Sequence, residues 1–151
     1  MRLVRPLTEG EIALANSVFG ASIDYARVRI IRGRWWPFHP KGIVMAPTGN
    51  IHFHPADPRW SDDYANESLS LQGLFIHEMT HVWQAQKGGR FYLPLMRHPF
   101  CRYGYQLQQG RSFDRYGLEQ QAEIVRHRFL ADRGVTVPQQ CDRSLLPFER
   151  N

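Results

Sequence analysis

The chain has 151 residues, of which 42% are hydrophobic and 22% charged, and its formal net charge is +5. Domains usually contain about 100–150 residues, so we predict one domain over residues 1–151, with a tail from about residue 135 packed on its body. This composition excludes a disordered chain. No segment reaches the roughly 20 apolar residues of a membrane span or has the pattern of a secretory signal peptide. We therefore expect no membrane association and synthesis in the cytoplasm.

The positive charge comes almost entirely from arginine, because only two of the basic residues are lysines. Four arginines between residues 27 and 34 precede Trp35 and Trp36, which is the nearest approach to a nucleic-acid-binding pattern. On a strand, Arg27 and Arg29 would share one face, which favours a solvated strand surface. A nucleic-acid partner is therefore the less favoured expectation. The two cysteines, Cys101 and Cys141, form no metal-binding or redox motif, and their pairing stays open.

The first third of the chain predicts one helix and three strands. Thr8 and Glu11 have the spacing of a capping box at the start of a helix over residues 8–19. Alternating apolar residues, with turn residues at 47–49, then predict strands at 25–32, 43–46 and 50–54. We expect the last two to form a hairpin and all three to form a small antiparallel sheet.

The rest of the chain predicts two long helices. The first covers about residues 68–87 and ends at Gly88–Gly89, and the second covers residues 117–133 and ends at Gly134. Between them, residues 90–115 are rich in glycine, proline and aromatic residues and predict an irregular crossover. The predicted fold class is therefore α+β.

The first long helix contains the sequence His77-Glu78-Met79-Thr80-His81, an HExxH pattern. Residues four apart on a helix project from the same side, so both imidazoles can bind one ion. In such sites the glutamate does not bind the metal but takes a proton from water that the metal activates. The pattern predicts His77 and His81 as zinc ligands and Glu78 as the general base.

A catalytic zinc usually has three protein ligands, so another part of the chain must supply one. The second long helix offers Glu119 and Glu123, which are also four apart. We favour Glu119 as the third ligand and Glu123 as the acceptor for a ring N–H of a liganding histidine. The competing candidates for the third ligand are His52, His54, His98 and Asp114.

Three segments together resemble a known family. They are 49–55 (GNIHFHP), 74–84 (LFIHEMTHVWQ) and 116–123 (YGLEQQAE). HExxH followed by a helix with ExxA[DE] resembles the gluzincin arrangement, and the three segments resemble the zincin-like domain at the C-terminus of some VgrG spike proteins of type VI secretion systems. Standalone Vgr-related proteins are similar. The resemblance extends over about residues 5–130, and it is least clear over 88–115.

The resemblance implies a zincin-like metallopeptidase. A small antiparallel sheet would pack against the HExxH helix, with a second helix carrying the third ligand, and Zn2+ would bind His77, His81 and Glu119. It also implies an antibacterial toxin that cleaves a peptide or protein substrate, with a secretion spike or an immunity protein as partner. Such a toxin would be delivered to the periplasm of a target cell.

Peptide hydrolysis also needs a donor for the oxyanion and a place for the substrate. We expect Tyr116 to be the donor, with Tyr103, Tyr105 and Arg115 as weaker candidates. Zincins commonly bind substrate as an extra strand beside the active-site helix, and this predicts that Ile51, His52 and Phe53 form the substrate edge.

Two other functions compete with the peptidase. A zinc-stabilised interaction module would bind a partner without cleaving it, and it would have no need for a base at Glu78. A basic nucleic-acid binder, ranked third, would bind DNA or RNA with a strong dependence on salt.

Overall fold

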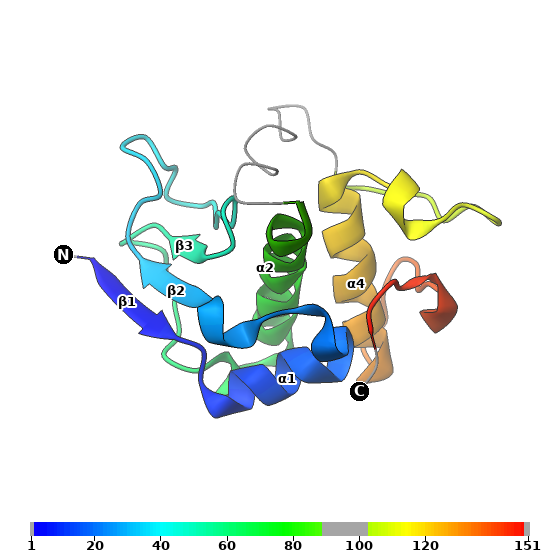
Figure 1. The fold of residues 1–151 in the computed structure, drawn as a ribbon, viewed down its shortest axis with the longest axis horizontal. Coiled ribbons are helices and arrows are strands. Elements are labelled where there is room, and N and C mark those ends of the chain that lie inside the picture. Colours follow the sequence, from blue (N-terminus) through cyan, green and yellow to red (C-terminus); the bar gives the residue numbers. More distant parts are fainter. Residues whose placement is uncertain (1, 89–102, 150–151) are drawn as a thin grey trace.

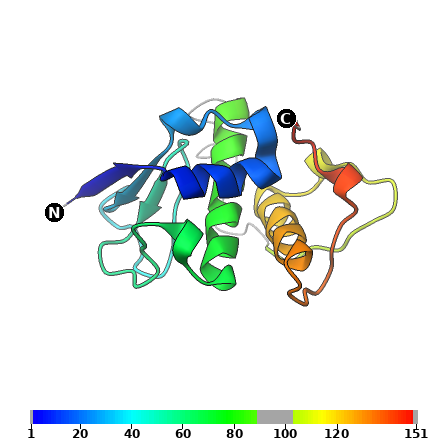
Figure 2. The ribbon, with the colours of Figure 1, turned by 90° about the horizontal axis from the view of Figure 1, so that it is seen from below.

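Helix α2 (Leu69–Gly88) lies at the centre of the fold in the computed structural model, which describes residues 2–88 and 103–149. The small sheet lies on one side of α2 and helix α4 (Leu118–Asp132) on the other, while α1 (Glu9–Phe19) crosses below them (Figures 1 and 2). The predicted α+β class is confirmed for the described residues. None of the helices in these ranges has the length and apolar character that a membrane span needs.

The sheet has the order β1 (Leu3–Pro6), β2 (Arg29–Arg32), β3 (Ile51–Phe53) and is mixed. Strand β1 pairs with β2 in the antiparallel direction, but β2 and β3 are parallel. The expectation of an all-antiparallel sheet was therefore wrong. Two parallel strands need a crossover, and residues 33–50 return along the sheet before β3 begins.

The expected hairpin is reduced to one antiparallel bridge between Met45 and His52. Its first strand does not extend because buried His39 holds the preceding loop: its Nδ1 accepts from Trp35 N–H at 3.1 Å, and its Nε2 lies 2.5 Å from the Ile43 carbonyl oxygen. The strand expected over 25–32 is also shorter, since Tyr25–Arg27 forms a 3-10 turn.

Helix α1 begins as its sequence predicts. Thr8 caps the helix, and its hydroxyl accepts a hydrogen bond from Glu11 N–H while Glu11 Oε1 accepts from Thr8 N–H. The Glu11 side chain is buried and forms a two-pronged ion pair with Arg5, and it also accepts from Tyr64 N–H. This carboxylate joins the start of α1 to β1 and to the segment that leads into α2.

Helices α2 and α4 pack closely, and this contact builds the site. Gly73 of α2 faces α4, where an added Cβ would lie 3.3 Å from a methyl carbon of Leu130. Ala122 of α4 is fully buried. Small residues on both helices let the backbones approach, so side chains from α2 and α4 can meet between the two helices.

Aromatic side chains fill the core on both sides of α2. Phe53, Tyr64 and Phe75 form a stacked row between the sheet and α2, with ring centroids 5.9 and 5.7 Å apart. On the other side, Phe148 from the C-terminal tail packs edge-on against Phe19 and Trp83. The tail therefore lies over α1 and α2.

Candidate metal centre

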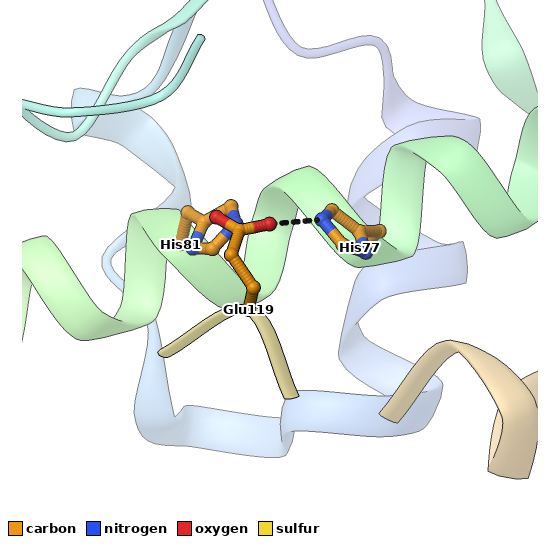
Figure 3. A group of neighbouring side chains, drawn as sticks. All are labelled: His77, His81 and Glu119. Carbon is orange, nitrogen blue, oxygen red and sulfur yellow. Dashed lines mark ion pairs between the residues drawn. The ribbon is translucent and has the colours of Figure 1, made fainter. Parts of the chain in front are cut away.

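Three side chains converge where α2 meets the first turn of α4. His77 and His81 project from the same side of α2, and Glu119 reaches between them from α4 (Figure 3). Glu119 Oε2 lies 3.3 Å from His77 Nε2, and Oε1 lies 2.8 Å from His81 Nε2. All three side chains are at least nine-tenths buried.

The other ring nitrogen of each histidine also has a partner. His77 Nδ1–H donates to Glu123 Oε2 at 2.9 Å, and Glu123 is held in turn by Arg126, whose Nε lies 2.6 Å from the same oxygen. His81 Nδ1–H donates to Gln84 Oε1 at 2.7 Å. Outer contacts of this kind fix the ring and direct the Nε2 lone pair of a metal ligand.

The carboxylates of Glu119 and Glu123 favour positive charge at this site. Burial alone would lower the pKa of His77, but its hydrogen bonds to Glu119 and Glu123 outweigh that effect and raise the pKa to about 9. The pKa of Glu123 is about 2. Burial raises this pKa, but the hydrogen bonds from His77 and Arg126 lower it by more than burial raises it. Glu123 therefore stays ionised at neutral pH, and positive charge between the imidazoles and Glu119 is favoured.

The geometry fits a metal ion. One ligand atom from each of His77, His81 and Glu119 can be chosen so that all three atoms lie within 4.8 Å of one another. Two imidazole nitrogens and one carboxylate are a donor set that zinc uses in catalytic sites, where a fourth position remains for water or substrate. Glu119 Oε1 lies 2.8 Å from His81 Nε2, so a cation bound to that nitrogen would also meet a carboxylate oxygen.

Glu78 lies beside this group without belonging to it. Its Oε1 is 4.0 Å from His77 Nε2, and the side chain is 7% exposed. Glu78 lines a cleft of about 300 Å³. The cleft residues are Gly42, Ile43, Val44, Arg59, Ser70, Leu71, Leu74, His77, Glu78, Tyr103, Glu123 and Arg126.

Tyr116, which is expected to be the oxyanion donor, is not one of the residues that line this cleft. It is 4% exposed, and its hydroxyl accepts a hydrogen bond from Gln108 N–H at 3.1 Å. Tyr103 lines the cleft instead and stacks on His77 with ring centroids 6.0 Å apart. The Tyr105 hydroxyl lies 2.6 Å from His127 Nδ1, and the backbone carbonyl of Arg115 accepts from Arg111.

The residues that are expected to form the substrate edge lie inside the fold. Ile51, His52 and Phe53 are all buried. The His52 N–H and carbonyl that would face a substrate are bonded to Met45, at 2.7 and 3.0 Å. The backbone edge of β3 is therefore already paired at His52. The segment from Gly42 to Val44 lines the cleft instead.

The competing candidates for the third ligand lie apart from the metal group, as far as the described residues go. His52 is buried in β3, and His54 contacts Arg34. Asp114 accepts from the Ser112 hydroxyl in the 3-10 turn before α4. His98 and Cys101 lie outside the described residues, and Cys141 is a buried free cysteine.

Sequence analysis missed one residue of the site, Gln84. It follows His81 by three positions and His77 by seven, so the three lie on one side of α2. That spacing was available in the sequence. Glutamine carries no charge and has no metal-binding motif, and for this reason it gave no chemical signal.

Comparison with known proteins gives two matches, and no protein-family model matches the chain. The type VI secretion system spike protein VgrG2b of Pseudomonas aeruginosa strain PAO1 is 46% identical over 132 residues, which cover 83% of this chain. The chain spans only 13% of the length of that protein. The solved effector domain of Pseudomonas aeruginosa VgrG2b is 45% identical, with a TM-score of 0.75, and the match covers 85% of this chain and 75% of that domain. The chain therefore belongs to the family of the VgrG2b effector domain.

Proposed function

We propose that this protein is a zinc-dependent metallopeptidase that acts as a type VI secretion-associated effector. The observation that carries the proposal is the convergence of His77, His81 and Glu119 within 4.8 Å, with Glu78 beside them on an open cleft. A structural zinc site is closed on all sides, whereas a catalytic site keeps a position accessible. The cleft at this group supports the catalytic kind.

The residues of the chain divide the work of hydrolysis. His77 and His81 would hold zinc through Nε2, and Glu119 through its carboxylate. A zinc ion held there supplies a Lewis acid that polarises a carbonyl and lowers the pKa of water. Glu78 Oε accepts the proton of the attacking water and returns it to the nitrogen of the leaving amine.

The cleft supports an extended peptide as substrate. Gly42, Ile43 and Val44 line it together with Leu71 and Leu74 of α2, which contribute apolar surface. Tyr103 is 51% exposed and its ring stacks on His77, and this supports Tyr103 as the donor of a hydrogen bond to the oxyanion, the role that the sequence suggested for Tyr116.

The family suggests where such an activity would be used. The similar solved domain is described as an effector domain, and the similar curated protein as a type VI secretion spike. We propose delivery with a spike protein into a target cell, with the periplasm as the site of action and an immunity protein as the protective partner.

The decisive variant is Glu78→Gln, which removes the base and keeps the shape of the side chain. We expect wild type to cleave peptides in a quenched fluorescent library, and the variant to be slower by about 100-fold or more with unchanged zinc content. Expression directed to the periplasm of a bacterial host should be toxic for wild type only. Equal behaviour of both proteins, with zinc bound, would instead favour the non-catalytic interaction module.

A further inference from the structure

The side chain of Gln84 touches both halves of the metal centre. It is 2% exposed and lies between α2 and the first turn of α4. Its Oε1 accepts from His81 Nδ1, while its Nε2 donates to the backbone carbonyl of Leu118 at 3.1 Å and to Gln121 Oε1 at 2.9 Å. Leu118 immediately precedes the ligand Glu119.

The direction of these hydrogen bonds is fixed by backbone carbonyls. A carbonyl can only accept, so the amide atom of Gln84 that faces Leu118 O must be nitrogen. Gln121 is held in the same way, because its Nε2 donates to Tyr116 O at 2.9 Å and leaves Oε1 to accept from Gln84. Reversing the direction of these hydrogen bonds would require both amide groups to turn so that an amide oxygen faced a backbone carbonyl oxygen. The Gln84 atom facing His81 is therefore oxygen.

An oxygen at this place dictates which nitrogen of His81 carries the proton. Only a protonated Nδ1 can donate to Gln84 Oε1 at 2.7 Å. A neutral His81 then has its lone pair on Nε2, on the side of Glu119. Without Gln84, the neutral ring would favour a proton on Nε2, where Glu119 Oε1 lies 2.8 Å away as an acceptor. That proton would occupy the position of the metal.

We infer that Gln84 is a positioning residue that holds His81 in the Nδ1–H tautomer and ties it to the helix turn that carries Glu119, so that the metal centre is assembled before the ion binds. The two histidines are thus held by different chemistry: a carboxylate for His77 and a neutral amide, relayed to backbone carbonyls, for His81. The inference rests on the metal site of the proposed function but not on peptidase activity.

The first test is the tautomer of His81 in the metal-free wild-type protein. Long-range proton–nitrogen correlation spectra at about pH 10, where an ordinary imidazole is neutral, distinguish a protonated Nδ1 from a protonated Nε2. We expect Nδ1–H in wild type. An Nε2–H tautomer would overturn the inference. Because no zinc or substrate is present, this result does not depend on whether the protein is an enzyme.

Gln84→Met keeps the length of the side chain and removes all three hydrogen bonds. We expect its His81 to change to the Nε2–H tautomer and its zinc dissociation constant to rise about 10- to 100-fold. Gln72→Met is the matched control, since Gln72 lies on the same helix and donates to a backbone carbonyl, that of Ala65, away from the site. An unchanged tautomer and affinity in Gln84→Met would contradict the inference.

Gln84→Glu covers the case in which the methionine variant does not fold. A carboxylate at this place still accepts from His81 but no longer donates to Leu118 O. We expect the Nδ1–H tautomer to be retained, with an altered visible spectrum of the cobalt-loaded protein because the charge beside His81 has changed. A tautomer that changes in this variant would show that the acceptor at residue 84 does not set it.

Discussion

His77 donates from Nδ1 to Glu123 at 2.9 Å while its Nε2 lies 3.3 Å from Glu119. The two carboxylates come from successive turns of α4 and lie on opposite edges of one imidazole ring. They are therefore unequal: Glu119 faces the position of an ion together with His81, whereas Glu123 faces away from it and is shared with Arg126. This difference supports Glu119 as the proposed ligand and Glu123 as the residue proposed to support His77.

The assignment predicts different losses of metal for two equivalent substitutions. Glu119→Gln removes a ligand charge, and we expect the purified variant to bind no zinc at stoichiometric concentration. Glu123→Gln keeps an acceptor for His77, so it should still bind zinc, about 10- to 100-fold more weakly than wild type. Metal analysis and a chelator competition assay measure both. If Glu123→Gln lost the ion and Glu119→Gln kept it, the two roles would have to be exchanged.

Zinc affinity should depend on pH through His77. The pKa of about 9 in the metal-free protein means that this ring is protonated at pH 7, so an ion must displace a proton. Raising the pH removes the competing proton, and we expect the affinity to increase by up to about tenfold per pH unit from this group until pH 9. Competition titrations at pH 6.5, 7.5 and 8.5 test this. In Glu123→Gln the slope should be smaller, because a neutral partner stabilises the imidazolium less.

The same group gives the metal-free protein the opposite dependence. A folded-state pKa above the unfolded value of 6.5 stabilises the fold fully below pH 6.5, and the contribution is lost as the pH rises through 9. In a chelator, we expect the melting temperature of wild type to fall between pH 7 and 9 relative to that of Glu123→Gln. Zinc should remove most of this difference, since the ion replaces the proton.

His52 should destabilise the fold in mild acid. Burial first, and then electrostatic interactions with Arg2 and His39, lower its pKa from 6.5 to about 4. The unfolded chain then binds a proton near pH 6.5 that the folded chain refuses, so stability is lost as the pH falls from 6.5 towards 4. The free energy of unfolding should decrease by about 2 kcal/mol from this group between pH 7 and pH 5. Urea unfolding in chelator should show that decrease for wild type and not for His52→Gln.

The chemistry of the site was more accessible from the sequence than the sheet was. The spacing of His77, Glu78 and His81 within one helix places them by local geometry alone, and Glu119 and Glu123 follow from the same helical rule. The sheet depends on contacts between distant segments. Buried His39 shortens the expected hairpin, and the segment between β2 and β3 returns so that the two strands pair in parallel. Neither feature is indicated by a pattern of neighbouring residues in the sequence.

The position of Tyr116, the residue predicted to donate to an oxyanion, was harder to predict for a similar reason. Tyr116 lies three residues before Glu119 in sequence, but the chain enters the helix with this ring turned into the core. Tyr103 is far from His77 in sequence, but its ring stacks on that histidine. Proximity along the chain thus brought together the residues of the metal group within helices, where the geometry is regular, and was a poorer guide to which tyrosine lies beside His77.

Two tyrosine variants separate these positions experimentally. Tyr103→Phe keeps the ring on His77 and removes only the hydroxyl, so we expect zinc content to be unchanged and kcat for a cleaved peptide to fall by about 100-fold if the hydroxyl donates to the oxyanion. Tyr116→Phe is the matched control: it loses the hydrogen bond from Gln108 N–H, and we expect a lower melting temperature with kcat within about twofold of wild type. The reverse pattern, a loss of kcat in Tyr116→Phe alone, would return the role to Tyr116 and would require the segment before α4 to turn its ring towards the cleft when substrate binds.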